Sequence, residues 1–336
     1  MKNSFLLIVT VILSLNVFSQ DCFCGKSNIS EAGIKDGPAI LEHVATKRMV
    51  AYEYVREADV IWSKKVWSSI DVREKINQPL YYPLDEITAS GAWIQNNQRV
   101  SLWSIIRCNV FAGNLTIFSP YNANNLFGNR DGDQMKYPVQ PTPGRNYYTD
   151  SAYREELLYY FGKLGPQKDV PLTDPYGDPL IQIINGVKTY VYEPRDTIWY
   201  ASKDIIQYRI KEDWFIDKER SKIDVRITAI APVVLDYEMD ANGNKTIIGT
   251  KELFWLYFPH CRYIFNNYLL YNEQNDSQMM SFDDLFHKRR FSSTIYKESN
   301  VYDRDIETYA HGVDALLESE RIKEKIRTLE SDVWSF

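Results

Sequence analysis

The sequence predicts an α+β fold, in which hairpin strands and helices are mixed along the chain and a long helix comes last. Two apolar runs within residues 181–192 are joined by Asn185-Gly186, a strong hairpin signal. Another hairpin is predicted within residues 224–258, turning at Asp240-Ala-Asn-Gly243. Apolar residues recur near helical spacing over residues 303–330. These three observations predict the α+β class.

The N-terminal residues 1–19 have the features of a cleaved signal peptide. A positive start is followed by an apolar stretch over residues 5–17 that is too short for a convincing membrane span. Neither Cys22 nor Cys24 follows the aliphatic and small residues that lipidation requires, so we expect no lipid anchor. Residues 20–45 hold Gly25, Gly33, Gly37 and Pro38 together with polar Asn and Ser residues, which predicts a flexible lead-in.

The next part, residues 46–150, is predicted to combine helices, strands and one long loop. Val60, Trp62, Val66 and Ile70 alternate imperfectly, as in a strand, and Pro79 is expected to close a short charged turn of helix. The predicted elements are a helix over residues 49–58, a strand over 59–70, a helical turn over 71–77, a helix over 101–110, an extended segment over 115–118, and an Asn-, Gly- and Pro-rich loop over 120–150.

The last part, residues 151–336, begins with an amphipathic helix predicted over residues 151–164. Ser281 followed by Asp284 has the form of a capping box, which predicts a helix start, and residues 291–296 have a strand-like composition. The C-terminal helix, interrupted by Gly312, is predicted from apolar residues near helical spacing: Ile306, Tyr309, Ala310, Val313, Leu317, Ile322, Ile326 and Leu329.

Composition limits the function. The 336 residues carry a net charge of −6, which gives no general attraction to nucleic acid. The chain has 24 tyrosines and 8 tryptophans, a content that favours extended interfaces or contact with glycans.

The four cysteines allow three interpretations of the pair Cys108 and Cys261. In an exported protein these two residues could form a disulfide, stay as two buried thiols, or bond to another protein. Cys22 and Cys24 form a CxC sequence that we assign to the N-terminal arm. The spacing is not that of a zinc site, and we predict no metal site.

Catalytic motifs are missing from the sequence. It holds four histidines and none of the HExxH, GxSxG, GxGxxG or P-loop patterns, so no catalytic residue or cofactor is predicted. A glycosidase pair of carboxylates is defined by its separation in space, so a glycan- or peptidoglycan-binding or -cleaving protein stays open as an alternative.

Residues 281–304 combine a capped helix, a basic run and strand-like residues, and they have the composition of a docking surface. The basic run contains Lys288, Arg289 and Arg290. For the two arginines, an interface and a solvated helix end with internal ion pairs are equally supported.

Three segments carry a resemblance to a known family: VREADVIWSKKVWSSIDVREKINQPLYYP (residues 55–83), LFWLYFPHCRYIFNNYLLYN (residues 253–272) and SFDDLFHKRRFSSTIYKESNVYDRDIETYAHGVDALLESERI (residues 281–322). They resemble the gliding motility GldN family, whose counterpart in non-gliding bacteria is called PorN. The resemblance covers about residues 46–330.

The resemblance implies a non-catalytic structural subunit of the type IX secretion machinery of Bacteroidetes. Such a subunit would be periplasmic, would form a large ring with a GldK/PorK-like lipoprotein, and would couple to the GldL–GldM (or PorM-like) motor. Its contact with the outer membrane would be indirect, through the lipoprotein. A secreted substrate of the machinery is disfavoured, because the predicted last helix leaves no separate C-terminal sorting domain.

For an assembly protein of this kind we predict a set of interface residues. Core packing is the favoured alternative for the two tryptophans among them. The set is Lys288, Arg289, Arg290, Phe291, Tyr296, Arg304, Trp62, Trp67, Arg73 and Tyr81.

Overall fold

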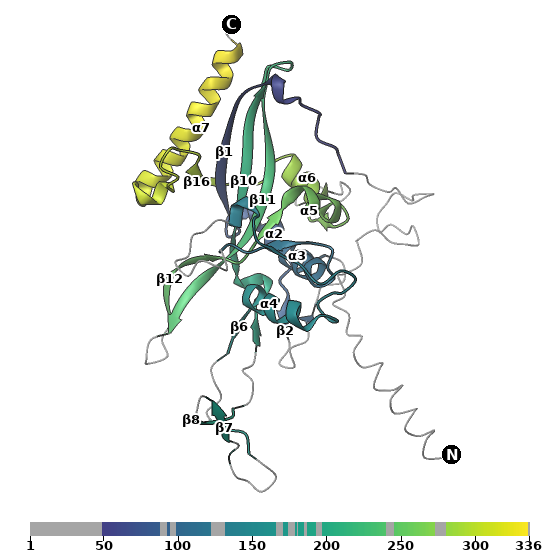
Figure 1. The fold of residues 1–336 in the computed structure, drawn as a ribbon. Coiled ribbons are helices and arrows are strands. Elements are labelled where there is room, and N and C mark those ends of the chain that lie inside the picture. The colour runs from purple at the N-terminus through teal and green to yellow at the C-terminus, as the bar shows by residue number, and fades with distance from the viewer. Residues whose placement is uncertain are drawn as a thin grey trace, which may run out of the picture. The chain divides into compact units, whose positions relative to one another are not determined.

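The protein is described from a computed structural model that covers residues 49–87, 93–94, 99–121, 132–165, 171–173, 179, 181–184, 187–192, 197–239, 245–272 and 280–334. The predicted signal peptide and lead-in lie outside these residues. The chain forms two compact units, one that combines the residues up to Gln140 with Ala201 onward and one from Pro141 to Tyr200. The α+β class is confirmed, because strands and helices are mixed in the larger unit (Figure 1).

An antiparallel eight-stranded sheet forms the centre of the larger unit (Figure 1). The strand order is β16-β1-β10-β11-β13-β4-β5, and β12 also pairs with β11. The bounds are β1 Val60–Asp71, β4 Ile117–Phe118, β5 Pro138–Val139, β10 Ile205–Asp217, β11 Lys222–Met239, β12 Lys245–Glu252, β13 Trp255–Tyr257 and β16 Thr294–Glu298. Strand β1 lies between β16 and β10, so this sheet contains residues from both of the predicted parts, 46–150 and 151–336. The predicted division of the chain at residue 150 stays a prediction.

Strand β1 confirms the strand predicted over residues 59–70, and its alternation decides which side chains enter the core. Val66 faces Glu212 across the β1–β10 pair, and the neighbouring Trp67 points to the opposite face. The Val66 side packs with Ile295, Ile322 and the residues around them in one hydrophobic cluster. Both faces of this part of the sheet are therefore covered.

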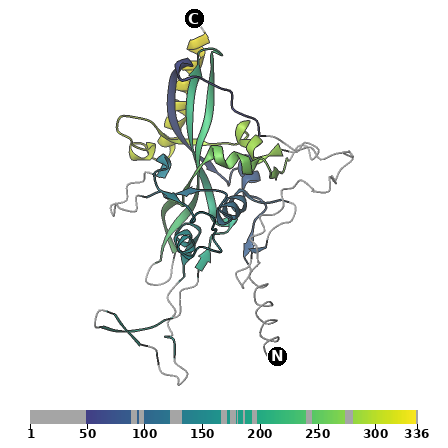
Figure 2. The same cartoon turned by 45° about the vertical axis from the view of Figure 1, so that its right-hand side comes forward.

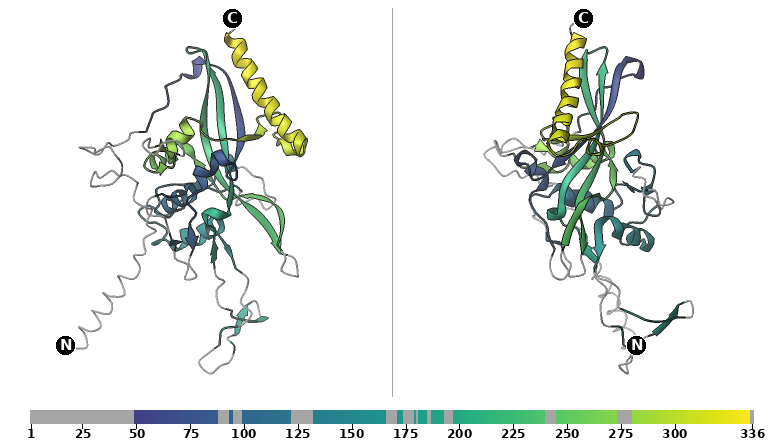
Figure 3. Two further views of the ribbon diagram at one scale, coloured as in Figure 1. Left: turned by 180° about the vertical axis from the view of Figure 1, so that it is seen from behind. Right: turned by 90° about the vertical axis from the view of Figure 1, so that its left-hand side faces the viewer.

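Helix α7, Val313–Trp334, confirms the long C-terminal helix but starts later than predicted. Gly312 has φ +60°, a left-handed conformation that ends the preceding segment, and only the single turn η5, Ile306–Thr308, precedes it. Ile322 and Ile326 of α7 lie in the same cluster as Val66. The helix runs alongside the long strands on the β16 side (Figures 2 and 3).

Helices α5, Phe258–Phe265, and α6, Phe282–His287, lie on the β11 side of the sheet (Figure 1). The predicted capping box of α6 is confirmed. The Ser281 hydroxyl accepts from the Asp284 N–H at 3.2 Å, and the Asp284 carboxylate accepts from the Ser281 N–H at 3.0 Å. Two helix N–H groups are thereby satisfied where the helix begins in the interior.

Helix α3, Leu102–Phe111, confirms the helix predicted over residues 101–110 and is buried along its whole length. Its N-cap Ser101 donates to the carboxylate of buried Asp85, and the Ser104 hydroxyl also donates to it. Burial raises the pKa of Asp85 to about 6, although the charge of Arg107 and hydrogen bonds from Ser101 and Ser202 act in the opposite direction.

Three expectations are corrected. Residues 49–56 form no helix, because this segment is extended and only η1, Glu57–Asp59, is helical. Pro79 does not close a helix; it lies in the first turn of α2, Gln78–Tyr81, where a missing N–H costs nothing. The second hairpin returns at Lys245 in β12 rather than at residue 253, because β11 is long enough to pair with both β12 and β13.

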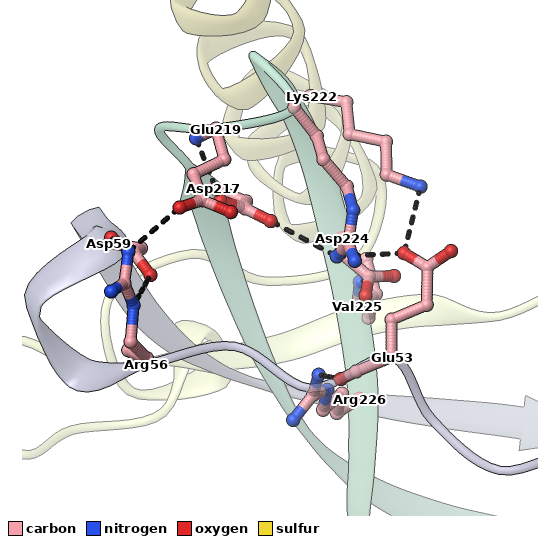
Figure 4. Close-up of polar contacts among 10 residues, drawn as sticks. Glu53, Arg56, Asp59, Asp217, Glu219, Lys222, Asp224, Val225 and Arg226 are labelled. Carbon is pink, nitrogen blue, oxygen red and sulfur yellow. Dashed lines mark hydrogen bonds and ion pairs between the residues drawn. The ribbon is translucent and has the colours of Figure 1, made fainter.

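The extended N-terminal segment crosses the end of the β10–β11 hairpin and is held there by charged groups (Figure 4). The Glu53 carbonyl accepts from Arg226, and the Glu53 carboxylate pairs with Arg220 at 2.8 Å. Arg56 pairs with Glu219 at 2.7 Å. These pairs are largely exposed, so solvent screens them and each contributes little to stability.

The smaller unit contains helix α4, Ser151–Phe161, which confirms the start of the helix predicted over residues 151–164 but ends three residues earlier, where strand β6 (Gly162–Leu164) begins. Asp150 caps it, accepting from the N–H groups of Ala152 and Tyr153. The predicted hairpin is also confirmed: β7, Ile181–Ile184, pairs with β8, Val187–Tyr190, with Ile184 facing Val187. The remaining short elements of the chain are β2 Glu86–Ile87, β3 Trp93–Ile94, β6 Gly162–Leu164, β9 Thr197–Trp199, β14 Leu269–Leu270, β15 Met280–Ser281, η2 Lys75–Asn77, η3 Gly132–Gln134 and η4 Ser202–Asp204.

Candidate functional site

The two predicted interface tryptophans lie in the core. Trp67 is 7% exposed and packs against Trp255, with its indole N–H 3.2 Å from an Asp133 carboxylate oxygen. The ammonium groups of Lys211 and Lys297 lie 5.5 and 5.1 Å from its ring. Trp62 is half-buried against the cluster beneath α7. Core packing, the favoured alternative, therefore describes both.

Phe291 and Tyr296 are also packing residues. Phe291 is 9% exposed, and its ring lies 5.7 Å from that of Phe286. Tyr296 packs against the Trp67 cluster, and the Arg209 guanidinium lies 4.7 Å from its ring. Burial raises the pKa of the Tyr296 hydroxyl far above its usual value. Phe291 is therefore a buried packing residue, and Tyr296 is a half-buried one.

Arg289 neutralises a buried carboxylate. Its guanidinium lies 2.6 Å from Glu212 Oε1, and the Glu212 side chain has no exposed surface. Glu212 also accepts from the Trp214 indole N–H at 3.1 Å, and Arg289 lies 5.4 Å above that ring. Arg289 adopts φ +50°, which turns its side chain back over the sheet after α6 ends. Of the two interpretations, the internal ion pair describes Arg289.

Lys288 and Arg290 point outward on either side of Arg289. The carboxylates of α6 do not neutralise them, because Asp283 pairs with buried Arg262 at 2.7 Å and Asp284 caps the helix. These two cations, which we call the basic turn, stand at the C-terminal end of α6, where positive charge is favourable. They are the part of the predicted basic run that is accessible to a partner.

Arg73 and Tyr81 are brought together in one surface pocket of about 370 Å³, here named the Tyr81 pocket. Its lining is Val72, Arg73, Gln78, Tyr81, Tyr82, Lys203, Ile205 and Ile206. The volume is at the lower end of the range for small-molecule sites. The Arg73 guanidinium is held by Asp71 at 2.7 Å, and the Tyr81 hydroxyl donates to the Lys203 carbonyl at 3.4 Å. Both predicted residues therefore belong to an accessible site.

Arg304 is exposed and belongs to an apolar ridge that periodicity alone did not reveal. Its guanidinium lies 4.9 Å from the Tyr302 ring and 4.6 Å from the Tyr309 ring. Val313 and Leu317, predicted with the buried side of the last helix, are 70% and 63% exposed. The α7 ridge consists of Arg304 and six exposed apolar or aromatic residues: Val301, Tyr302, Tyr309, Val313, Leu316 and Leu317.

Comparison with known protein families shows to which family this chain belongs. The chain matches the gliding motility associated protein GldN over residues 55–335. This chain belongs to the GldN family. No curated protein matches it. The matched range of this GldN-family chain includes the basic turn, the Tyr81 pocket and the α7 ridge, and the family is associated with gliding motility and type IX secretion.

Of the three interpretations left open for Cys108 and Cys261 in this GldN-family chain, the disulfide between them is excluded. Cys261 is a free, fully buried thiol whose Sγ lies 3.4 Å from the Tyr257 carbonyl, whereas Cys108 is disulfide-bonded. Cys261 lies on α5 beside buried Arg262, so its side chain is fixed by helix packing. Burial raises the pKa of the Cys261 thiol well above its usual range.

The described residues of this GldN-family chain contain no group of three His, Cys, Asp or Glu side chains that could hold a metal ion. None of its described helices is long and apolar enough to cross a membrane. Among the described residues that line the Tyr81 pocket, the charged side chains are those of Arg73 and Lys203.

Proposed function

We propose that this chain is an exported, non-catalytic structural subunit of the type IX secretion and gliding machinery. It works in the periplasm, at the inner side of the outer membrane, and binds a GldK/PorK-like lipoprotein that holds it there. Copies of it associate into a ring that couples to the GldL–GldM motor. The observation that carries the proposal is the family match over residues 55–335, nearly the whole described chain.

The surface chemistry supports an assembly role. The basic turn, the Tyr81 pocket and the α7 ridge offer separate accessible sites rich in Arg, Lys, Tyr and Leu. Arginine and tyrosine are enriched where interfaces derive most of their binding energy. We assign the basic turn to a negatively charged surface of the lipoprotein or the motor component.

A test uses a deletion strain complemented with charge-reversed variants. K288E/R290E reverses the basic turn, while Arg289 is left unchanged because its loss would expose the charge of Glu212 inside the protein. K218E/K325E, which reverses two other exposed lysines, is the matched control. Envelopes are fractionated, the tagged protein is purified in mild detergent, and the eluate is imaged by negative stain.

We expect wild type and the control to co-purify with a lipoprotein in ring-shaped particles and to support secretion of cargo into the medium. K288E/R290E should fold but lose the lipoprotein or the motor component. Wild type that is recovered alone from intact envelopes, or a deletion that secretes normally, would contradict the proposed function. Normal assembly of K288E/R290E would contradict the role of the basic turn.

A further inference from the structure

The exposed apolar residues of the ridge that lie on α7 are directed away from the core side of that helix. Ile322 and Ile326 contact the sheet, whereas Val313, Leu316 and Leu317 are spaced so that they share the opposite side of α7. Leu316 is 54% exposed and Tyr302 is 76% exposed. Within the described residues, these side chains are therefore left largely uncovered.

The ridge is ordered by contacts among its own residues. Arg304 lies against the rings of Tyr302 and Tyr309, and the Tyr309 hydroxyl donates to Glu318 at 3.4 Å. Rigid tyrosines, a stacked arginine and adjacent leucines are the composition of binding hot spots. An exposed apolar group of this size on one helix turn and the loop before it indicates an interaction surface.

The rim of the ridge is acidic. Residues 301–320 hold six carboxylates and one arginine. Lys297 neutralises Asp303 at 2.9 Å, but Glu307 and Asp314 are exposed and form no ion pair with any described residue. The surface that covers the ridge should therefore be apolar in its centre and cationic at its edge.

The Tyr81 pocket has this complementary chemistry. Val72, Ile205 and Ile206 give it apolar walls, and the side chains of Arg73 and Lys203 are the charged members of its lining. Arg73 is already paired with Asp71, whereas Lys203 is exposed and forms no ion pair with any described residue. A pocket of about 370 Å³ has room for aliphatic side chains such as those of Leu316 and Leu317. The apolar centre of the pocket therefore suits the leucines of the ridge, and the positive charge at the edge of the pocket suits the acidic rim of the ridge.

We propose that the α7 ridge of one copy binds the Tyr81 pocket of a second copy of this chain. The two surfaces are different, so the contact is heterologous and can repeat from each copy to the next. The inference deepens the proposed function by naming the surfaces through which copies associate. It rests on the self-association included there, but its test in purified protein needs no other component of the machinery.

The test uses two variants that each break one surface. L316D/L317D places carboxylates at the centre of the ridge, and R73E/K203E reverses the edge of the pocket. The matched control is I247D/I248D, which introduces the same change at two aliphatic residues of β12 that are 59% and 64% exposed. Circular dichroism checks that all variants fold, and sedimentation velocity measures self-association over a concentration series.

We expect wild type and the control to self-associate, and each broken variant to show a Kd raised at least about tenfold. When the two variants are mixed, the intact ridge of R73E/K203E should bind the intact pocket of L316D/L317D. The product should be a dimer that grows no further, because its remaining ridge and pocket are both disrupted. Wild type that stays monomeric throughout, or an L316D/L317D variant that associates like the control, overturns the proposal.

Photo-crosslinking in cells gives a second readout. A photoreactive amino acid replaces Leu317, and the adduct is mapped by mass spectrometry. Attachment to residues 72–82 or 203–206 of another copy supports the proposal. Attachment to a lipoprotein or to a motor component overturns it while leaving the proposed function intact, and normal secretion by a deletion strain overturns the proposed function separately.

Discussion

Replacing Arg289 by alanine should destabilise the protein, although Arg289 lies in a run of surface cations. The substitution removes the cation that faces Glu212, whose side chain is fully buried. Loss of one partner of a buried ion pair costs about 3–5 kcal/mol. Here we expect about 2–3 kcal/mol, because Arg289 is 34% exposed and Glu212 keeps the Trp214 indole N–H as a donor.

Two further variants separate the causes. R289A/E212Q removes the unpaired charge together with its partner and should recover most of the loss, giving a coupling of about 1–2 kcal/mol in the double-mutant cycle. Arg289 also adopts φ +50°, so R289G should be more stable than R289A by about 1 kcal/mol, since glycine relieves the left-handed strain.

The assay is urea denaturation followed by tryptophan fluorescence and far-UV circular dichroism. R290A, one residue further along and exposed, is the control and should stay within about 0.5 kcal/mol of wild type. The reasoning is refuted if R289A also stays within that limit, or if R290A loses as much as R289A.

Three other predictions follow from buried groups. R262M should lower the free energy of unfolding by about 3–5 kcal/mol, because it leaves the buried Asp283 carboxylate unpaired. It should also speed proteolysis near Val50, whose carbonyl accepts a hydrogen bond from Arg262, and unchanged cleavage there would contradict this second prediction. Cys261 should resist alkylation in the native protein and react fully in urea, as mass spectrometry would show, because burial raises its pKa; rapid native labelling would contradict this. Burial raises the pKa of Asp85 to about 6, above its unfolded value of about 3.9. The contribution of Asp85 to the free energy of unfolding is therefore complete below about pH 3.9, and up to about 3 kcal/mol is lost as the pH rises through about 6. The variant D85N should remove this loss from the pH dependence of stability, and an unchanged pH profile would contradict the prediction.

Local signals predicted individual elements well. The Ser281–Asp284 capping box, the hairpin around residues 185–186 and strand β1 all depend on residues close in sequence, and each is present. The helix expected at residues 49–58 failed because that segment is held by distant partners, such as Arg262 at Val50 and Arg226 at Glu53. Long-range contacts therefore overrode local propensity there.

The candidate site was predicted only in part. Lys288, Arg290, Arg73, Tyr81 and Arg304 are accessible, but Arg289 lies between two of them and serves the core. No local pattern could show this, because its partner Glu212 lies 77 residues away in the chain. Equally, helical spacing grouped Val313 and Leu317 with Ile322 and Ile326, although only the latter two reach the sheet.

By itself the sequence determined the α+β class, most element positions and the resemblance to the GldN family, because these follow from short-range periodicity, capping, turn residues and distinctive segments. The tertiary structure alone decided which cations are accessible, that Cys261 is a free thiol, and that an apolar ridge and a cation-edged pocket lie on the surface. The reason is physical. Exposure and charge neutralisation depend on which distant strands and helices come into contact, and a residue's neighbours in sequence do not specify those contacts.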